Sequence, residues 1–150
     1  MLQQRWRRLL PALWAGWMLC VALLATPAPF ATLAVQDAGR VVGRMLAQEA
    51  YTALLLGIAI VLFERAAARR GVGPQFSLEM GLALGTIFCT VAGYFAIQPL
   101  MAAARLGQGA LTFGQLHAIS AGFYGVKLLL VLALAWRATR GGSTATAPSS

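Results

Sequence analysis

Residues 113–136, the last long apolar stretch of the chain, read FGQLHAISAGFYGVKLLLVLALAW and decide the fold. As an α-helix, a stretch of this length extends over about 36 Å at 1.5 Å per residue. That is enough to cross the hydrocarbon core of a bilayer, which is about 30 Å thick. Lys127 is the one charged side chain in the stretch. The stretch therefore predicts a transmembrane helix.

Three earlier apolar runs have a comparable length, at residues 9–33, 45–63 and 78–98. Each is close to the roughly 20 residues that a membrane-spanning helix needs. The connections between the runs are short and polar. The sequence thus predicts an all-α, polytopic integral membrane protein, with a four-transmembrane-helix bundle as a single domain over residues 9–137.

The overall composition leads to the same class. Hydrophobic residues make up 59% of the 150 residues and charged residues 11%, against about 45–50% and about 25% in soluble domains. A soluble chain of this length would have too few polar residues to cover its surface. We therefore expect the lipid bilayer to be its main partner.

The two ends of the chain differ in composition from the apolar runs. Residues 1–8 are basic, and we expect them to form a cytoplasmic N-terminal segment. The apolar run that follows is longer than the 7–15 residues of a signal peptide, so we expect it to stay in the membrane. Pro27 and Pro29 should end or kink its helix. Residues 141–150, GGSTATAPSS, have nothing to bury and are predicted to be a disordered cytoplasmic tail.

The basic residues predict the orientation. Eleven of the twelve are arginines that mostly flank the apolar runs, which is a topology signal and argues against a nucleic-acid partner. In a four-span arrangement eight lie on one side and three on the other: Arg5, Arg7, Arg8, Arg65, Arg69, Arg70, Arg137 and Arg140 against Arg40, Arg44 and Arg105. Because positive loops stay inside, we expect both termini in the cytoplasm, with the protein in a bacterial inner membrane.

Small residues recur at every third or fourth position of three apolar runs. Such stripes let helix backbones approach closely in lipid, and we expect them to pack the bundle. The alternative is a homodimer formed through one of them. The stripes are Gly81, Gly85, Cys89 and Gly93 in the third run, Gly114, Ala118, Gly122 and Gly125 in the fourth, and Ala12, Gly16 and Cys20 in the first.

Polar residues inside the runs are the candidates for function, because ionisable groups are costly at membrane depth. In the last run, four polar residues lie within an arc of about 80° around the helix axis, at 100° per residue. They are His117, Ser120, Tyr124 and Lys127. Counting from the predicted helix ends favours a contact between Glu49 and His117. For Lys127 it leaves three alternatives: an extended reach to Glu79, a position directed toward the cytoplasmic interface, or one facing hydroxyls such as those of Tyr124 and Thr90. The alternative role for these groups is interhelical hydrogen bonding. The full set is Glu49, Glu79, Gln98, His117, Ser120, Tyr124 and Lys127.

No motif in the sequence carries catalytic chemistry. Ser120 lies one turn from His117, but no third group orients the pair, so we do not expect an enzyme. Cys20 and Cys89 form no CxxC pair, and we expect no metal site and no cofactor. The leading interpretation is a small transport or accessory component, with a possible membrane-protein partner. The alternative is a redox, metal or haem-associated protein with His117, Glu49 and the cysteines as ligands.

Three stretches resemble a bacterial family known as domain of unknown function 4149, which is similar to transmembrane protein 205. The stretches are LWAGWMLCVALLATPAPFATL (13–33), AGRVVGRML (38–46) and FGQLHAISAGFYGVKLLL (113–130). The shared motifs are a helix end at residues 27–30, a glycine turn at 39–43 and Leu-His-x-x-Ser at 116–120. The resemblance covers roughly residues 10–137 and implies a four-helix membrane domain without a known molecular activity. A fainter similarity links the chain to copper-resistance and haem-linked membrane families, whose sites use histidines; this chain has one.

Overall fold

The computed structural model describes residues 2–140, which form helices and no strand. The predicted tail at 141–150 lies outside these residues. Four helical segments are long and apolar enough to cross a membrane, which confirms the all-α prediction. The first span consists of α1 (Leu2–Cys20), the π-helical turn η1 (Val21–Ala25) and α2 (Pro27–Thr32), and the second is α3 (Val35–Arg69). The third span consists of α4 (Leu78–Thr90), the π-helical turn η2 (Val91–Ala96) and α5 (Ile97–Arg105), and the fourth is α6 (Phe113–Arg140).

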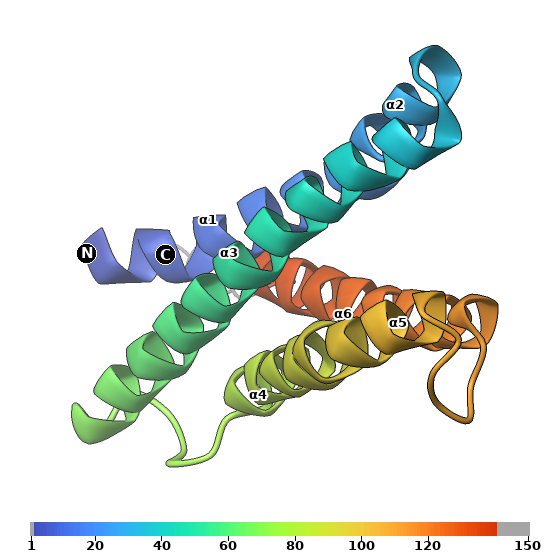
Figure 1. The fold of residues 1–150 in the computed structure, drawn as a ribbon. Helices are drawn as coiled ribbons and strands as arrows, with labels where there is room; N and C mark the ends of the chain where they lie inside the picture. Colours follow the sequence, from blue (N-terminus) through green and yellow to red (C-terminus); the bar gives the residue numbers. More distant parts are fainter. Residues whose placement is uncertain (1, 141–150) are drawn as a thin grey trace, which may run out of the picture.

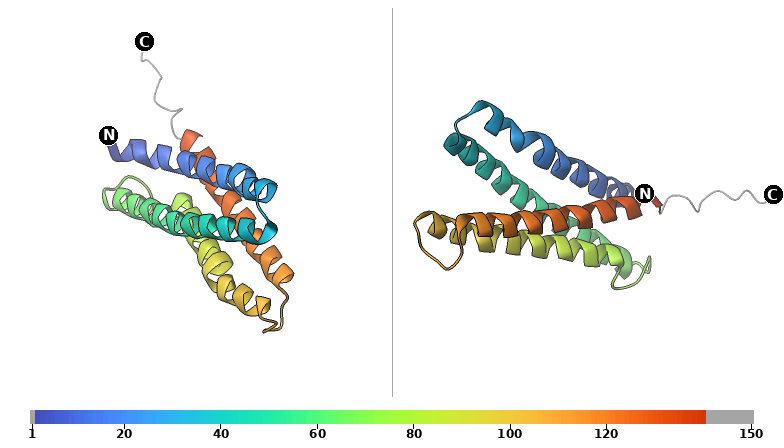
Figure 2. Two further views of the ribbon diagram at one scale, coloured as in Figure 1. Left: turned by 45° about the horizontal axis from the view of Figure 1, so that its top comes forward. Right: turned by 90° about the vertical axis from the view of Figure 1, so that its right-hand side faces the viewer.

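The helices exchange partners along the length of the bundle (Figures 1 and 2). At the end that holds the start of α1, the end of α3 and the end of α6, α1 packs on α6 and α3 packs on α4. We call this the basic end. At the opposite end α2 packs on α3 and α5 packs on α6, and the two pairs diverge like the arms of a V (Figure 1).

Of the two apolar cores that residues 2–140 form, the larger joins the helices between these two ends, and the smaller one, of Ile97, Met101 and Leu116, lies between α5 and α6. The most buried side chains of the larger core come from α1, α3, α4 and α6 and include Trp14, Met18, Ala83, Val131 and Leu134. Trp14, which is 1% exposed, belongs to this core and not to an interfacial belt. The core closes the centre of the bundle between the V and the basic end.

The outer surface of the helices is apolar. Leu13, Leu23, Leu55 and Leu129 all leave more than half of their surface exposed. Exposed leucine in such numbers is unfavourable in water but fits hydrocarbon. Together with the span lengths, this surface indicates a multi-pass membrane protein.

The second span is longer than the sequence predicted. Residues 35–44 were expected to form a polar connection, but α3 already begins at Val35, and Gly39 and Gly43 lie within the helix. An isolated helical glycine costs only about 1 kcal/mol relative to alanine. Burial of Ala38 and Val42 outweighs that cost. The predicted glycine turn is therefore wrong.

Pro27 and Pro99 both lie inside helical spans and do not end them. A π-helical turn precedes each: the Thr26 amide donates to the Val21 carbonyl, five residues back, at 2.9 Å, and η2 precedes Pro99. A π turn widens the helix locally, so it accommodates the proline ring and its missing N–H. The spans consequently continue to Thr32 and Arg105, beyond the predicted end at Gln98.

Two helices end in the same glycine motif. Gly71 after α3 and Gly107 after α5 have φ values of +72° and +73°. In each case the next residue's amide donates back to a helix carbonyl at 3.0 Å, from Val72 to Ala67 and from Gln108 to Ala103. This arrangement is a Schellman motif, which favours glycine because an L side chain rarely adopts positive φ.

Candidate functional site

The divergent arms enclose a cavity of about 700 Å³. Every span contributes to its wall, and both π-helical turns do so as well. Six of the seven candidate residues named from the sequence line it; Glu79 does not. The polar and charged side chains in the wall are Thr26, Arg40, Glu49, Thr90, Tyr94, Gln98, Arg105, His117, Ser120, Tyr124 and Lys127.

A buried ion pair forms the inner end of this cavity. The Lys127 ammonium donates to both carboxylate oxygens of Glu49, at 2.7 and 2.9 Å. The two side chains are 4% and 2% exposed. The same ammonium lies 4.8 Å from the centre of the Tyr124 ring, a cation–π contact. Each charge is therefore compensated where neither could be solvated alone.

Two predicted contacts of these residues are wrong, whereas the alternative that places Lys127 beside Tyr124 agrees with the structure. Glu49 does not contact His117, and Lys127 does not reach toward Glu79. The error came from the start of α3: Glu49 is fourteen residues into a helix that begins at Val35, not four residues into one that begins at Met45. Lys127 is likewise fourteen residues into α6. At 1.5 Å per residue both lie about 21 Å from the same end.

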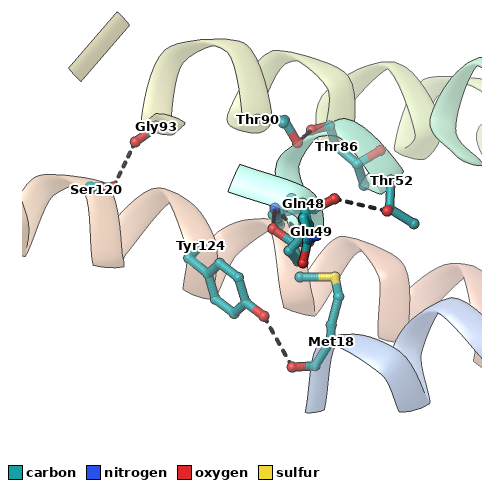
Figure 3. Close-up of polar contacts among 10 residues, drawn as sticks. Met18, Gln48, Glu49, Thr52, Thr86, Thr90, Gly93, Ser120 and Tyr124 are labelled. Carbon is teal, nitrogen blue, oxygen red and sulfur yellow. Dashed lines mark hydrogen bonds and ion pairs between the residues drawn. The ribbon is translucent and has the colours of Figure 1, made fainter. Parts of the chain in front are cut away.

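Ser120 and Tyr124 hold α6 against its neighbours (Figure 3). The Ser120 hydroxyl donates to the Gly93 carbonyl in η2 at 2.6 Å. The Tyr124 hydroxyl donates to the Met18 carbonyl in α1 at 3.0 Å. These bonds match the alternative that the sequence analysis left open, namely that part of the stripe serves as interhelical hydrogen bonding.

Two threonines of α4 face the ion pair without bonding to it. Thr86 donates to Ala83 O at 2.7 Å and Thr90 to Thr86 O at 2.8 Å, so both hydroxyls are used within their own helix (Figure 3). Both side chains are buried. Glu49 and Lys127 therefore rely on each other.

His117 belongs to the mouth of the cavity. Its ring stacks on Phe113 with centroids 6.0 Å apart and an interplanar angle of 16°. The Arg105 guanidinium lies on the same phenyl ring, 4.7 Å from its centre. On the other arm, Arg40 lies 3.4 Å from Asp37 in an exposed pair. Basic and aromatic groups thus surround the opening.

Two more ion pairs tie the helices together at the basic end. Glu64 of α3 is only 8% exposed; it accepts from Arg7 of α1 at 2.7 Å and from Ser77 at 2.9 Å. Ser77 also caps α4 by accepting from the Met80 amide. Glu79, a predicted site residue, pairs instead with Arg137 of α6 at 2.8 Å. A smaller cavity of about 210 Å³ lies among these groups.

Sequence reasoning missed the Arg7–Glu64–Ser77 group because it assigned the flanking arginines to topology alone. The available signal was positional. An antiparallel bundle brings the start of the first span next to the end of the second, so a basic residue and an acid at those points can meet. Tyr124 offered no comparable signal, since its partner is a backbone carbonyl.

Of these two ion pairs, the more buried one, Arg7–Glu64, should contribute more to stability. We expect Glu64→Gln to lower the free energy of unfolding by about 1–3 kcal/mol, because the negative charge is lost and the amide NH2 that replaces one carboxylate oxygen cannot accept from Arg7 or Ser77. The matched change Glu79→Gln removes a more exposed pair and should cost less than about 1 kcal/mol. SDS titration in mixed micelles measures both. Equal losses would contradict the difference in burial.

The residues considered as metal ligands are not assembled. Cys89 is buried in the cavity wall, whereas Cys20 is exposed. Among residues 2–140, no three histidine, cysteine, aspartate or glutamate side chains lie together as a metal would require. Of the other two proposed ligands, Glu49 is paired with Lys127, and His117 stacks on Phe113.

Fold and site together define a class of protein. It is all-helical, its four spans are long enough to cross a membrane, and they surround a cavity that opens at one end and ends at a buried ion pair. The family follows from the sequence. Residues 9–110 match the family described as Domain of unknown function (DUF4149), and the chain belongs to it. No curated protein and no solved structure matches the chain. The function therefore has to be argued from the geometry.

Proposed function

We propose that this protein is a small, non-enzymatic transport component of the bacterial inner membrane, related to transmembrane protein 205, with both termini in the cytoplasm. In this proposal the cavity admits a small ligand from the outer side. The observation that carries it is the ion pair of Lys127 and Glu49 at the cavity's inner end. Ionisable pairs at membrane depth are expensive as mere structure and typically mark substrate pathways.

The positions of the two cavities support a transport role. The large cavity reaches from the opening to Lys127, and the small one lies on the other side of the apolar core at the basic end. Ile60 and Leu134 belong to both the core and the wall of the small cavity. A bundle open on one side and closed on the other by such a core corresponds to one state of an alternating-access cycle.

The chemistry of the cavity wall supports a binding role over a catalytic one. The Ser120 hydroxyl, the nucleophile considered in the sequence, is engaged with the Gly93 carbonyl at 2.6 Å. His117, the base considered with it, stacks on Phe113. Neither arrangement activates a hydroxyl for attack.

The accessory part of the proposal concerns a partner in the membrane, either another protein or a second copy. Gly122 and Gly125 of α6 have no neighbouring atom within 4 Å where a Cβ would lie. Gly122 lines a shallow apolar groove between α4 and α6, together with Phe88 and Val126. Backbone that is open in this way lets another helix approach closely.

Thiol labelling tests the cavity. Ala121 is exposed in the wall of the cavity, and Ile119, two residues away on α6, faces the outer groove. In a Cys20→Ser, Cys89→Ser background, we expect Ala121→Cys to react with a membrane-impermeant methanethiosulfonate and Ile119→Cys to stay unreactive, because only the first meets water. If Ala121→Cys does not react, the proposed ligand cavity is wrong.

The side of reaction tests the orientation. With both termini inside, Ala121→Cys should react in spheroplasts and not in sealed inside-out vesicles. A fluorescent protein fused after residue 150 should then fluoresce, and alkaline phosphatase fused there should be inactive. Labelling confined to inside-out vesicles, with active phosphatase, would reverse the topology.

A further inference from the structure

We infer that the cavity binds an organic anion, with its acidic group held between Arg40 and Arg105 and its apolar body directed toward the Glu49–Lys127 pair. This inference rests on the proposed function and specifies the ligand class. It follows from two arginines that line one cavity, Arg40 from α3 and Arg105 from α5. These two helices belong to the two arms of the V in Figure 1.

The charges in the wall do not balance. The ionised side chains that line the cavity are Arg40, Arg105, Lys127 and Glu49. Lys127 and Glu49 neutralise each other through two short hydrogen bonds. The excess positive charge is therefore carried by the two arginines, and a cleft with charge of one sign concentrates counter-ions.

Both arginines retain the capacity to bind an anion. Arg40 contacts Asp37 at 3.4 Å, with side chains 75% and 61% exposed, and such surface pairs contribute little and exchange readily. Arg105 uses the face of its guanidinium on Phe113, at 4.7 Å, so the contact does not consume its N–H groups. A planar guanidinium fork matches phosphate and carboxylate oxygens.

The rest of the cavity selects the body of the ligand. Besides the arginines, the wall includes Phe30, Leu46 and Met101, which favour apolar atoms. A volume of about 700 Å³ lies within the range of small-molecule sites. Glu49 at the inner end disfavours a second acidic group there. The ligand is thus an amphipathic anion with its acid at one end, supplied either by the surrounding membrane or by solution.

Charge selectivity of labelling tests the arginines. In the Ala121→Cys protein in nanodiscs, sulfonatoethyl methanethiosulfonate should react at least about tenfold faster than the trimethylammonioethyl reagent, after each rate is divided by its rate with free 2-mercaptoethanol. Arg40→Gln with Arg105→Gln should bring the ratio close to one. Arg44→Gln is the matched control: Arg44 is exposed on α3 but does not line the cavity, so its loss should leave the ratio nearly unchanged.

Protection from labelling tests the ligand class and its source. Dodecyl phosphate should slow the reaction of Ala121→Cys, and dodecyltrimethylammonium should not. Protection by ethyl phosphate as well would assign a soluble anion, and protection by the dodecyl compound alone would assign a membrane amphiphile. A reactive cysteine with no charge preference and no protection by anions overturns the inference but leaves the cavity intact. A cysteine unreactive with both reagents overturns the cavity itself, and this inference with it.

Discussion

Replacing Lys127 with methionine should lower the free energy of unfolding by about 3–5 kcal/mol, the largest effect we expect from a single substitution. The change leaves the Glu49 carboxylate, 2% exposed, without its two hydrogen bonds. Burial of an unpaired charge is more costly than loss of the pair as a whole. SDS titration of the purified protein in mixed micelles measures the loss.

Two further variants make this prediction specific. The double change Glu49→Gln with Lys127→Met removes both charges and should recover most of the lost stability. Arg137→Met, on the same helix, breaks the exposed pair with Glu79 and should cost less than about 1 kcal/mol. If Lys127→Met unfolds at the wild-type SDS concentration, the buried pair does not form.

Replacing Gly93 with alanine should destabilise the protein by about 1–3 kcal/mol. A Cβ at this position would overlap the Cβ of Phe123, which sits on the α6 backbone and cannot rotate away. The two segments would have to separate, and the Ser120 bond to the Gly93 carbonyl would lengthen with them. The same SDS titration reports the change.

Gly81 of the same span provides the matched control for Gly93. No atom lies within 4 Å of a Cβ built there. Because alanine is the better helix former by about 1 kcal/mol, Gly81→Ala should be neutral or stabilising. Equal losses at both positions would show that η2 and α6 are not in close contact.

The number and type of the helices could be read from the sequence, and their ends could not. Apolar length predicts a span directly, because the bilayer sets the length required. The second run was predicted to end at residue 63, whereas α3 continues to Arg69 and ends just before Gly71. The third run was predicted to end at Gln98, but the span continues to Arg105, because sequence periodicity does not reveal the π-helical turn η2 that precedes Pro99.

For the candidate site, the sequence predicts which face of α6 carries the polar residues, but it does not predict which acid pairs with Lys127. Spacing of three and four residues placed Ser120, Tyr124 and Lys127 on one side of α6, and all three line the cavity. Which acid meets Lys127 depends on how far α3 extends beyond the apolar run, and burial of Ala38 and Val42 sets that extent. The glycine stripe shows the same limit: Gly93 packs closely on α6, whereas Gly81 contacts nothing.

The two π-helical turns have a mechanical consequence. Each lies at the base of one arm of the V, before Pro27 and before Pro99, and each interrupts the regular ladder of main-chain hydrogen bonds. Where the ladder is already interrupted, a helix bends at little additional enthalpic cost. At these two turns α2 and α5 can accordingly change direction relative to α1 and α4, within the limits set by their packing on the uninterrupted helices α3 and α6. The π-helical turns therefore mark the two points of the main chain at which the entrance can change shape without rearrangement of the apolar core.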